Sequence, residues 1–161
     1  MSDRTDNAGA VRSVAIGADH GAVEQKQMLA SYLEMLGYRV VDLGTFGTEK
    51  VDYPDIAVAV CRKVTSGDCE RGILLDGAGI GSCMAANKVR GIRAAMCYDL
   101  RTIVNSREHN DANVLCLGGP LHKAEELAEM VRVWLATGFA GGRHIPRINK
   151  IMAIERGGFE R

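Results

Sequence analysis

The 161-residue sequence lacks an excess of charge of either sign, because lysine and arginine total 20 and aspartate and glutamate also total 20. A chain of zero formal net charge has no long-range field to attract nucleic acid or an anionic membrane. It also lacks any apolar run near the roughly 20 residues that a membrane-spanning helix needs. We therefore expect a small-molecule partner, and an anionic one must be held by local cations and backbone N–H groups.

Cysteine pairs of the metal-binding kind are also missing. The five cysteines contain no C-x-x-C spacing, and most of them lie in apolar stretches. Free cysteine is among the most buried residue types, and unpaired thiols persist in reducing compartments. The polar first ten residues lack the apolar core of a signal peptide. We expect buried thiols, a cytoplasmic protein and no fixed structure over residues 1–10.

Short apolar runs rich in β-branched residues alternate with longer segments of helical spacing. Strands are expected over residues 11–17, 38–43, 71–76, 91–97 and 113–118. Helices are expected over residues 22–36, 55–66, 99–107, 123–137 and 146–156, with a further helix after residues 77–81. This alternation predicts one α/β domain over residues 1–161, a three-layer α/β/α sandwich around a Rossmann-like, five-stranded parallel sheet.

Ligands of such folds bind beyond the carboxyl ends of the strands. The polar residues that follow the strands should therefore meet at one edge of the sheet. These residues are Asp19 with His20, Asp76, and Tyr98 with Asp99.

The most informative local pattern is a glycine-rich turn after the third expected strand. Asp76 is followed by Gly77, Ala78, Gly79, Ile80 and Gly81. Such a turn at a helix start leaves several backbone N–H groups free, which suits a phosphate or a developing oxyanion. A tight strand-to-helix turn without a ligand has the same pattern. A dinucleotide site is disfavoured, because the third glycine is misplaced and the strand is not the first.

Two histidines stand in polar segments next to expected strands. His20 follows Asp19 directly after the first strand, and His109 precedes the fifth. An unperturbed histidine has a pKa of about 6.5, so either could move a proton near neutral pH. Both could equally be surface or structural residues, and Asp19 could instead cap the following helix.

The densest cationic group outside the helices follows two glycines near the end of the chain. It consists of Arg143, His144 and Arg147. The planar guanidinium binds phosphate oxygens in pairs, so this group suits a phosphate clamp, although a solvated basic patch is the ordinary alternative. No metal-ligand spacing, G-x-S-x-G elbow or Walker loop is present. These parts fit metal-free proton transfer on a phosphorylated carbonyl compound.

Five segments, taken in order, resemble the ribose-5-phosphate isomerase B and galactose-6-phosphate isomerase family over roughly residues 12–156. They are Gly17–Gly21, Asp52–Pro54, the glycine-rich turn with Ala85–Lys88, His109–Asn113 and Gly141–Arg147. The resemblance implies an aldose–ketose isomerase that works through a 1,2-enediolate without a cofactor, with ribose 5-phosphate as the default substrate. It also implies a homodimer or tetramer whose active sites are built across the subunit interface.

The resemblance further implies a role for each matching residue. His109 would open the sugar ring, and Asp19 and His20 would lie near the ring oxygen or the phosphate. The connector and helix over residues 138–161 would bind the phosphate. The remaining ligands would be Arg143 and Arg147 on the phosphate, Tyr53 lining the pocket, and Asn110 with residues 77–81 around the enediolate.

One departure from the family pattern concerns the base that moves the proton. Many members carry a cysteine immediately before the glycine turn, where this chain has Asp76, and others use a glutamate where it reads Ser82-Cys83. Carboxylates are the base in other sugar-phosphate isomerases. We therefore expect Asp76 to be the base, with burial raising its pKa from about 3.9, and Cys83 to be the reserve candidate.

An aspartate at this place also resembles one of the two chain types of galactose-6-phosphate isomerase. Three alternatives therefore stay open. They are isomerisation of another sugar phosphate, such as an erythrulose phosphate or galactose 6-phosphate, a non-catalytic sugar-phosphate-binding subunit that needs a partner, and a nucleotide-binding regulatory domain.

Overall fold

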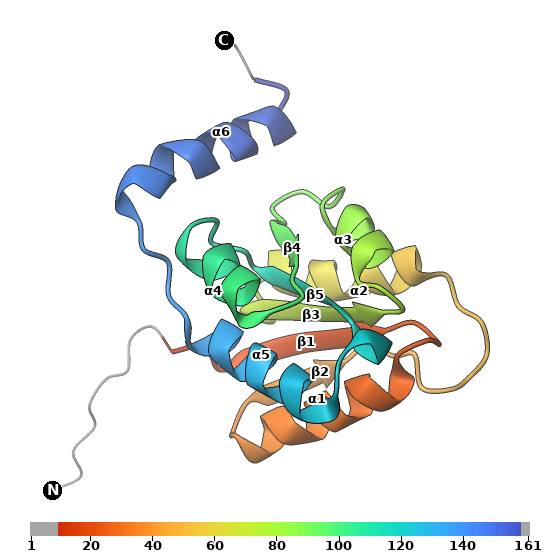
Figure 1. Cartoon of the computed structure of the whole chain (residues 1–161). Coiled ribbons are helices and arrows are strands. Elements are labelled where there is room, and N and C mark those ends of the chain that lie inside the picture. Colours follow the sequence, from red (N-terminus) through yellow and green to blue (C-terminus); the bar gives the residue numbers. More distant parts are fainter. Residues whose placement is uncertain (1–9, 159–161) are drawn as a thin grey trace, which may run out of the picture.

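The computed structural model describes residues 10–158, and its sheet has five parallel strands in the order β2-β1-β3-β5-β4 (Figure 1). The strands are β1 (Ser13–Ala18), β2 (Arg39–Asp42), β3 (Arg71–Asp76), β4 (Ala94–Met96) and β5 (Val114–Gly118). Ile16 of β1 pairs with Ile73 of β3, which pairs with Leu115 of β5. The carboxyl ends of these three central strands therefore reach the same edge of the sheet.

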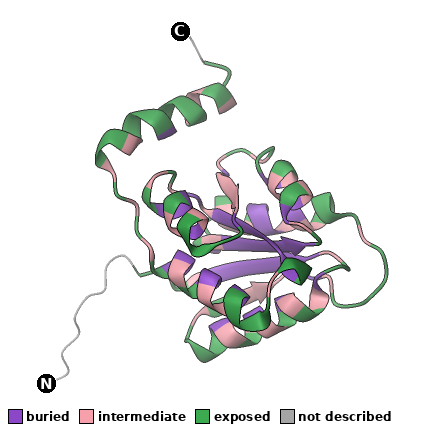
Figure 2. Cartoon of the chain, in the orientation of Figure 1, coloured by how far each residue is buried: buried purple, intermediate pink, exposed green. Residues whose placement is uncertain are grey.

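Helices cover both faces of the sheet and make the three layers that the alternation predicts (Figure 2). The α-helices are α1 (Val23–Met35), α2 (Tyr53–Thr65), α3 (Ile80–Ala86), α4 (Leu100–Glu108), α5 (Ala124–Ala136) and α6 (Ile145–Glu155), with 3₁₀ turns η1 (Gly119–Leu121) and η2 (Gly142–His144).

The core divides into two clusters because strand side chains alternate between the two faces. One face packs against α1, α4 and α5 through side chains such as Leu29, Ile103 and Trp134. The other packs against α2 and α3, with Val60 and Ala86 among its buried side chains. All five residues of β5 are buried, as expected for a central strand with both faces covered. The predicted fold class is confirmed.

The fourth strand is the main departure from the predicted elements, since it spans Ala94–Met96 instead of residues 91–97. The Asn113 side chain explains the difference. It accepts from the Arg93 N–H at 2.8 Å and donates to the Gly91 carbonyl oxygen at 2.8 Å, and so occupies backbone groups that a longer strand would use in the sheet. Of the prediction for residues 1–10, all but Ala10 lies outside the described residues.

Helix α6 lies apart from the sheet, at the end of the connector that leaves α5 (Figure 1). Its Glu155 Oε1 accepts from the Gly91 N–H at 2.8 Å, and its Met152 Sδ accepts from Arg93 Nη1 at 3.5 Å. Three isoleucines of this helix are 46 to 57% exposed: Ile145, Ile151 and Ile154. Apolar side chains gathered on one helix are typical of an incomplete contact surface. No helix within residues 10–158 is long and apolar enough to span a bilayer.

Candidate active site

The carboxyl edge of the sheet brings together Asp19, which follows β1, and Asp76, which is the last residue of β3. Asp19 follows β1 directly, and its N–H donates to the Leu75 carbonyl oxygen at 3.1 Å. The Asp19 side chain closes a turn, because Oδ1 accepts from the Gly21 N–H at 2.9 Å. It does not cap α1, whose start has no side-chain cap bond. The exposed His20 follows, and its Nδ1 accepts from the Val51 N–H at 3.3 Å.

Close packing shapes the glycine-rich turn. Gly79 has a φ of +77° at the start of α3, and a Cβ there would lie 2.8 Å from the carbonyl carbon of Leu117. A Cβ on Gly81 would lie 2.6 Å from the Tyr53 ring, so this ring packs directly on the turn. Among the described residues, no atom beyond its chain neighbours lies within 4 Å of a Cβ built on Gly77. The turn therefore has open backbone at Gly77 with Tyr53 at its side.

Hydrogen bonds from the turn occupy both oxygens of Asp76, which is only 5% exposed. Oδ1 accepts from the Ala78 N–H at 2.9 Å and from the Gly79 N–H, and Oδ2 accepts from the Ser82 N–H at 2.9 Å and the Ser82 hydroxyl at 2.6 Å. Burial raises the pKa of this carboxyl, but the hydrogen bonds outweigh burial and hold the pKa below its ordinary value. The expected upward shift is therefore wrong, and Asp76 is ionised at neutral pH.

Cys83, a residue of α3, is partly buried and packs against the core cluster that α2 and α3 cover. Its thiol donates to the Ala94 carbonyl oxygen at 3.5 Å and accepts from Asn87 Nδ2 at 3.6 Å. A hydrogen bond with the buried Cys116 thiol, opposed by burial, lowers the pKa of Cys83 to about 7. The other four cysteines are buried free thiols, as expected.

Asp99, the remaining predicted residue at a strand end, caps a helix. Its Oδ1 accepts from the Thr102 N–H at 2.7 Å at the start of α4, while the neighbouring Tyr98 is 61% exposed. Capping accounts for the polar residue after β4 without a ligand.

A second group of predicted residues gathers around the end of α4. His109 ends this helix, and its Nδ1 is hydrogen-bonded to Asn105 Nδ2 at 2.9 Å. The His109 ring stacks on His144, with centroids 4.2 Å apart and planes 15° apart. The adjoining cleft of 380 Å³ is also lined by Asn110, Arg143 and Arg147. The predicted phosphate clamp and the predicted ring-opening histidine therefore share one cleft.

The contact between His109 and His144 is a feature that sequence reasoning missed. The sequence pattern puts His144 in the cationic group and indicates no contact to His109. Desolvation and the charges of His109 and the neighbouring arginines lower the pKa of His144. A cleft with two imidazoles and two guanidinium groups is chemically suited to an anion and to proton transfer.

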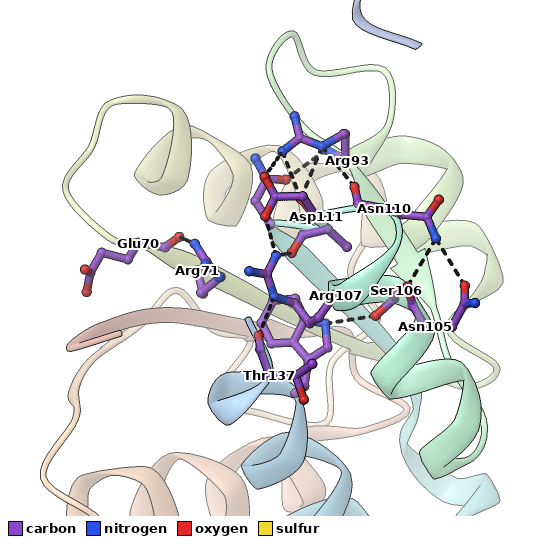
Figure 3. A network of polar contacts seen from close by, with 12 residues as sticks. Glu70, Arg71, Arg93, Asn105, Ser106, Arg107, Asn110, Asp111 and Thr137 are labelled. Carbon is purple, nitrogen blue, oxygen red and sulfur yellow. Dashed lines mark hydrogen bonds and ion pairs between the residues drawn. The ribbon is translucent and has the colours of Figure 1, made fainter. Parts of the chain in front are cut away.

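A buried polar network holds this second group in place (Figure 3). Arg107, which is 3% exposed, donates to Asp111 Oδ1 at 2.8 Å, to the Ala112 carbonyl at 2.6 Å and to the Thr137 carbonyl at 3.2 Å. Arg93 Nη2 donates to Asp111 Oδ2 at 3.1 Å. Thr137 follows α5 and starts the connector that leads to η2 and α6. Arg107 thus ties the His109 segment to the connector, a link that no periodic pattern in the sequence reveals.

The two groups lie at opposite ends of the parallel strands. Asp76 pairs with Gly118 at the carboxyl end of β5, whereas His109 precedes Val114 at its amino end. At about 3.3 Å per residue, a five-residue strand separates its ends by roughly 15 Å. Within one chain, the predicted base and the predicted phosphate ligands are therefore not brought together.

The family model described as "Ribose/Galactose Isomerase" matches residues 14–151. The chain belongs to this family. It is 38% identical over 146 residues to "Ribose-5-phosphate isomerase B" of Escherichia coli, covering 91% of this chain and 98% of that one. It is 41% identical over 140 residues to "D-erythrulose-4-phosphate isomerase" of Pectobacterium atrosepticum, covering 86% and 92%. The solved structure of Clostridium thermocellum ribose-5-phosphate isomerase B is similar, with a TM-score of 0.89, 46% identity and coverage of 90% and 98%.

Proposed function

We propose that this family member is an aldose–ketose isomerase that interconverts ribose 5-phosphate and ribulose 5-phosphate through a 1,2-enediolate. The observation that carries the proposal is the turn after β3, where the ionised carboxylate of Asp76 stands beside the open backbone at Gly77. A base next to oxyanion-stabilising donors is what enediolate chemistry requires. The sequence similarity to ribose-5-phosphate isomerase B supports the choice of substrate.

At the carboxyl edge, Asp76 is our candidate for the base. It would take the proton from C2 of the open-chain aldose and return it to C1, while the hydroxyl proton passes from O2 to O1. Ala78 and Gly79 already donate their N–H groups to Asp76, so the remaining N–H groups of residues 77–81 would stabilise the negative charge on the enediolate oxygens. Asp19 and His20 would lie near the ring oxygen, and the Tyr53 ring would close one side of the pocket.

At the amino edge, His109 is our candidate for ring opening, because it ends a helix in a cleft rich in donors. Arg143 and Arg147 would bind the phosphate through their planar guanidinium groups, and Asn110 would hydrogen-bond the enediolate. The lowered pKa of His144 favours a neutral ring stacked on His109, which avoids a second positive charge beside the proton-transferring imidazole.

The opposite locations of these two groups support a homodimer, or a tetramer of such dimers, with shared active sites. A second copy would present its His109 cleft to the Asp76 turn of the first, and a two-fold axis would build both sites at once. Exposed apolar side chains supply contact surface for it: Met84 on α3 is 67% exposed and Ile154 on α6 is 57% exposed. The five free thiols fit a reducing compartment, and we place the protein in the cytoplasm.

Two alternatives each rest on one observation. The similarity to D-erythrulose-4-phosphate isomerase supports a four-carbon sugar phosphate as an alternative substrate, and galactose 6-phosphate is a further sugar within the same chemistry. The full hydrogen bonding of Asp76 favours a non-catalytic sugar-phosphate-binding subunit, because a carboxylate with every oxygen engaged is a weak base.

The deciding experiment is an isomerase assay of the purified chain on four-, five- and six-carbon sugar phosphates without added metal. Turnover of ribose 5-phosphate supports the proposal, and faster turnover of another sugar identifies a different substrate. A folded protein that binds sugar phosphate without turnover would support the binding-subunit alternative. A mock purification from the expression host without this protein controls for contaminating isomerases, so that Asp76→Asn remains a test of the proposed base.

A further inference from the structure

A separate cavity of 660 Å³ opens at the amino edge of the sheet, between the start of β3, the end of α2 and residues 10–12. Its charged lining consists of Arg12, Glu70, Arg71, Arg93 and Asp111. It shares no lining residue with the cleft that holds His109 and Arg147. The cavity is therefore distinct from the proposed phosphate clamp.

Both carboxylates of this cavity already have partners, and Figure 3 shows those of Asp111. Asp111 is divided between two arginines, with Oδ2 accepting from Arg93 at 3.1 Å and Oδ1 from Arg107 at 2.8 Å. Glu70 Oε2 accepts from the Arg12 N–H at 2.5 Å and the Ser13 N–H at 3.0 Å. The donors to Glu70 are neutral N–H groups, so its charge, together with that of the shared Asp111, also acts on a third guanidinium group.

Arg71 supplies that third guanidinium group. Within residues 10–158 its side chain makes one hydrogen bond, from Nη1 to the Glu70 carbonyl oxygen at 2.8 Å, and its buried Nε has no partner. Burial and the nearby charge of Arg107 lower the pKa of Arg71, and the charges of Asp111 and Glu70 oppose this shift. Buried N–H groups in proteins are nearly always paired, and an unpaired one commonly marks a missing water or ion. Arg71 therefore belongs to a cluster at an open cavity in which four guanidinium groups, those of Arg12, Arg71, Arg93 and Arg107, face two carboxylates.

We propose that this cavity is a second anion-binding site, which takes inorganic phosphate or a phosphomonoester with Arg71 as its principal contact. A phosphate dianion would add negative charge where guanidinium groups are in excess, and Arg12 and Arg93 lie on the same walls as Arg71. The site goes beyond the proposed isomerase function, since none of its residues has a part in that chemistry.

The location also links the site to the His109 segment. Arg93 lines the cavity, and its Nε donates to the Asn110 carbonyl at 3.3 Å while its Nη2 donates to the Asp111 carbonyl at 2.8 Å. An anion bound in the cavity would therefore attract the side chain that holds the loop after His109. Occupancy of the site would therefore change the position of the loop that lines the neighbouring cleft.

The test counts phosphate sites per chain by equilibrium dialysis of radiolabelled inorganic phosphate in a phosphate-free buffer. The double variant Arg143→Gln/Arg147→Gln removes the proposed substrate clamp, and we expect it to keep one site. Adding Arg71→Met should raise the Kd of that remaining site at least about tenfold, since a charged fork is replaced by an apolar chain of similar length. Arg132→Met is the matched control, because Arg132 is an exposed arginine paired with Glu129 on α5.

Equal phosphate binding with and without Arg71→Met would overturn the proposal, as would the absence of binding in the double variant. If Arg71→Met does not fold by circular dichroism, Arg71→Lys replaces it, with an intermediate weakening expected because the charge stays and the fork is lost. Competition by glycerol 3-phosphate would identify a phosphomonoester site, and its absence a site for free phosphate. Failure of the isomerase assay would leave this site count unaffected.

Discussion

The two ends of the sheet hold their functional groups by different means. At the carboxyl edge, Asp19 directly follows β1 and Asp76 is the last residue of β3, so the register of the central strands fixes their positions. At the amino edge, His109 lies in a loop, and Arg143 and Arg147 lie on a connector and a helix set apart from the sheet.

The geometry of the two groups therefore depends on different interactions. The carboxyl-edge residues keep their geometry as long as the central strands pair. The amino-edge residues depend on Arg107 and Asp111, a pair at 2.8 Å with one partner almost fully buried. Loss of one partner of such a pair is costly because the other charge is left buried and unpaired. The proposed base is thus tied to the sheet, and the proposed phosphate clamp to a side-chain network.

The largest effect is expected from Asp76→Asn at the carboxyl edge. Loss of the base should lower kcat about 10²- to 10⁴-fold, as measured by ketose formation from ribose 5-phosphate. The control is Ser82→Ala, which removes the 2.6 Å hydrogen bond to Asp76 but leaves the carboxylate in place. A fully active Asp76→Asn would remove Asp76 from the mechanism.

Mixing two inactive variants tests whether the carboxyl edge of one chain and the amino edge of another form one active site. Asp76→Asn and His109→Gln impair opposite edges, so mixed dimers formed by co-expression should contain one intact site each and restore about a quarter of wild-type activity.

The matched control for mixing combines Asp76→Asn with Asp19→Asn, which impair the same edge. No intact site can form from that pair. Restoration in neither mixture would place the complete site within one chain and contradict the shared-site proposal.

A smaller effect is expected from Arg147→Ala at the amino edge. Because the phosphate is held equally in the ground and transition states, KM should rise by roughly tenfold with little change in kcat. Arg132→Ala on the surface of α5 should leave both constants unchanged. An equal fall in kcat would instead assign Arg147 to the chemical step.

The smallest effect concerns acid stability. The hydrogen bonds that lower the pKa of Asp76 stabilise the folded state at pH values above the unfolded pKa of about 3.9, and this stability is lost as pH falls through the lower, folded pKa. The difference in unfolding free energy between wild type and Asp76→Asn should stay constant above about pH 5 and shrink below about pH 4. A difference that first grows as the pH falls toward 4 would indicate a raised pKa.

Local patterns in the amino-acid sequence were enough to predict the architecture and to name the candidate site residues. Alternating apolar strands and amphipathic helices predict the parallel sheet, because local spacing reports which face of an element is buried. The pattern of Asp76 with its glycines, and of Arg143 with Arg147, is likewise local, so the chain itself identifies these candidates. The order of these segments along the chain also carries the family resemblance.

The arrangement and charge of these residues, by contrast, come from the tertiary structure. The direction of the Asp76 pKa shift depends on four hydrogen bonds, which burial alone does not predict. Contacts that spacing does not reveal set the stacking of His109 on His144, the ion pair of Arg107 with Asp111 and, within residues 10–158, the unpaired Nε of Arg71. Spacing along the chain encodes local periodicity, whereas distances across the sheet depend on strand order and register. For this reason the separation of the two edges is visible only in the folded chain.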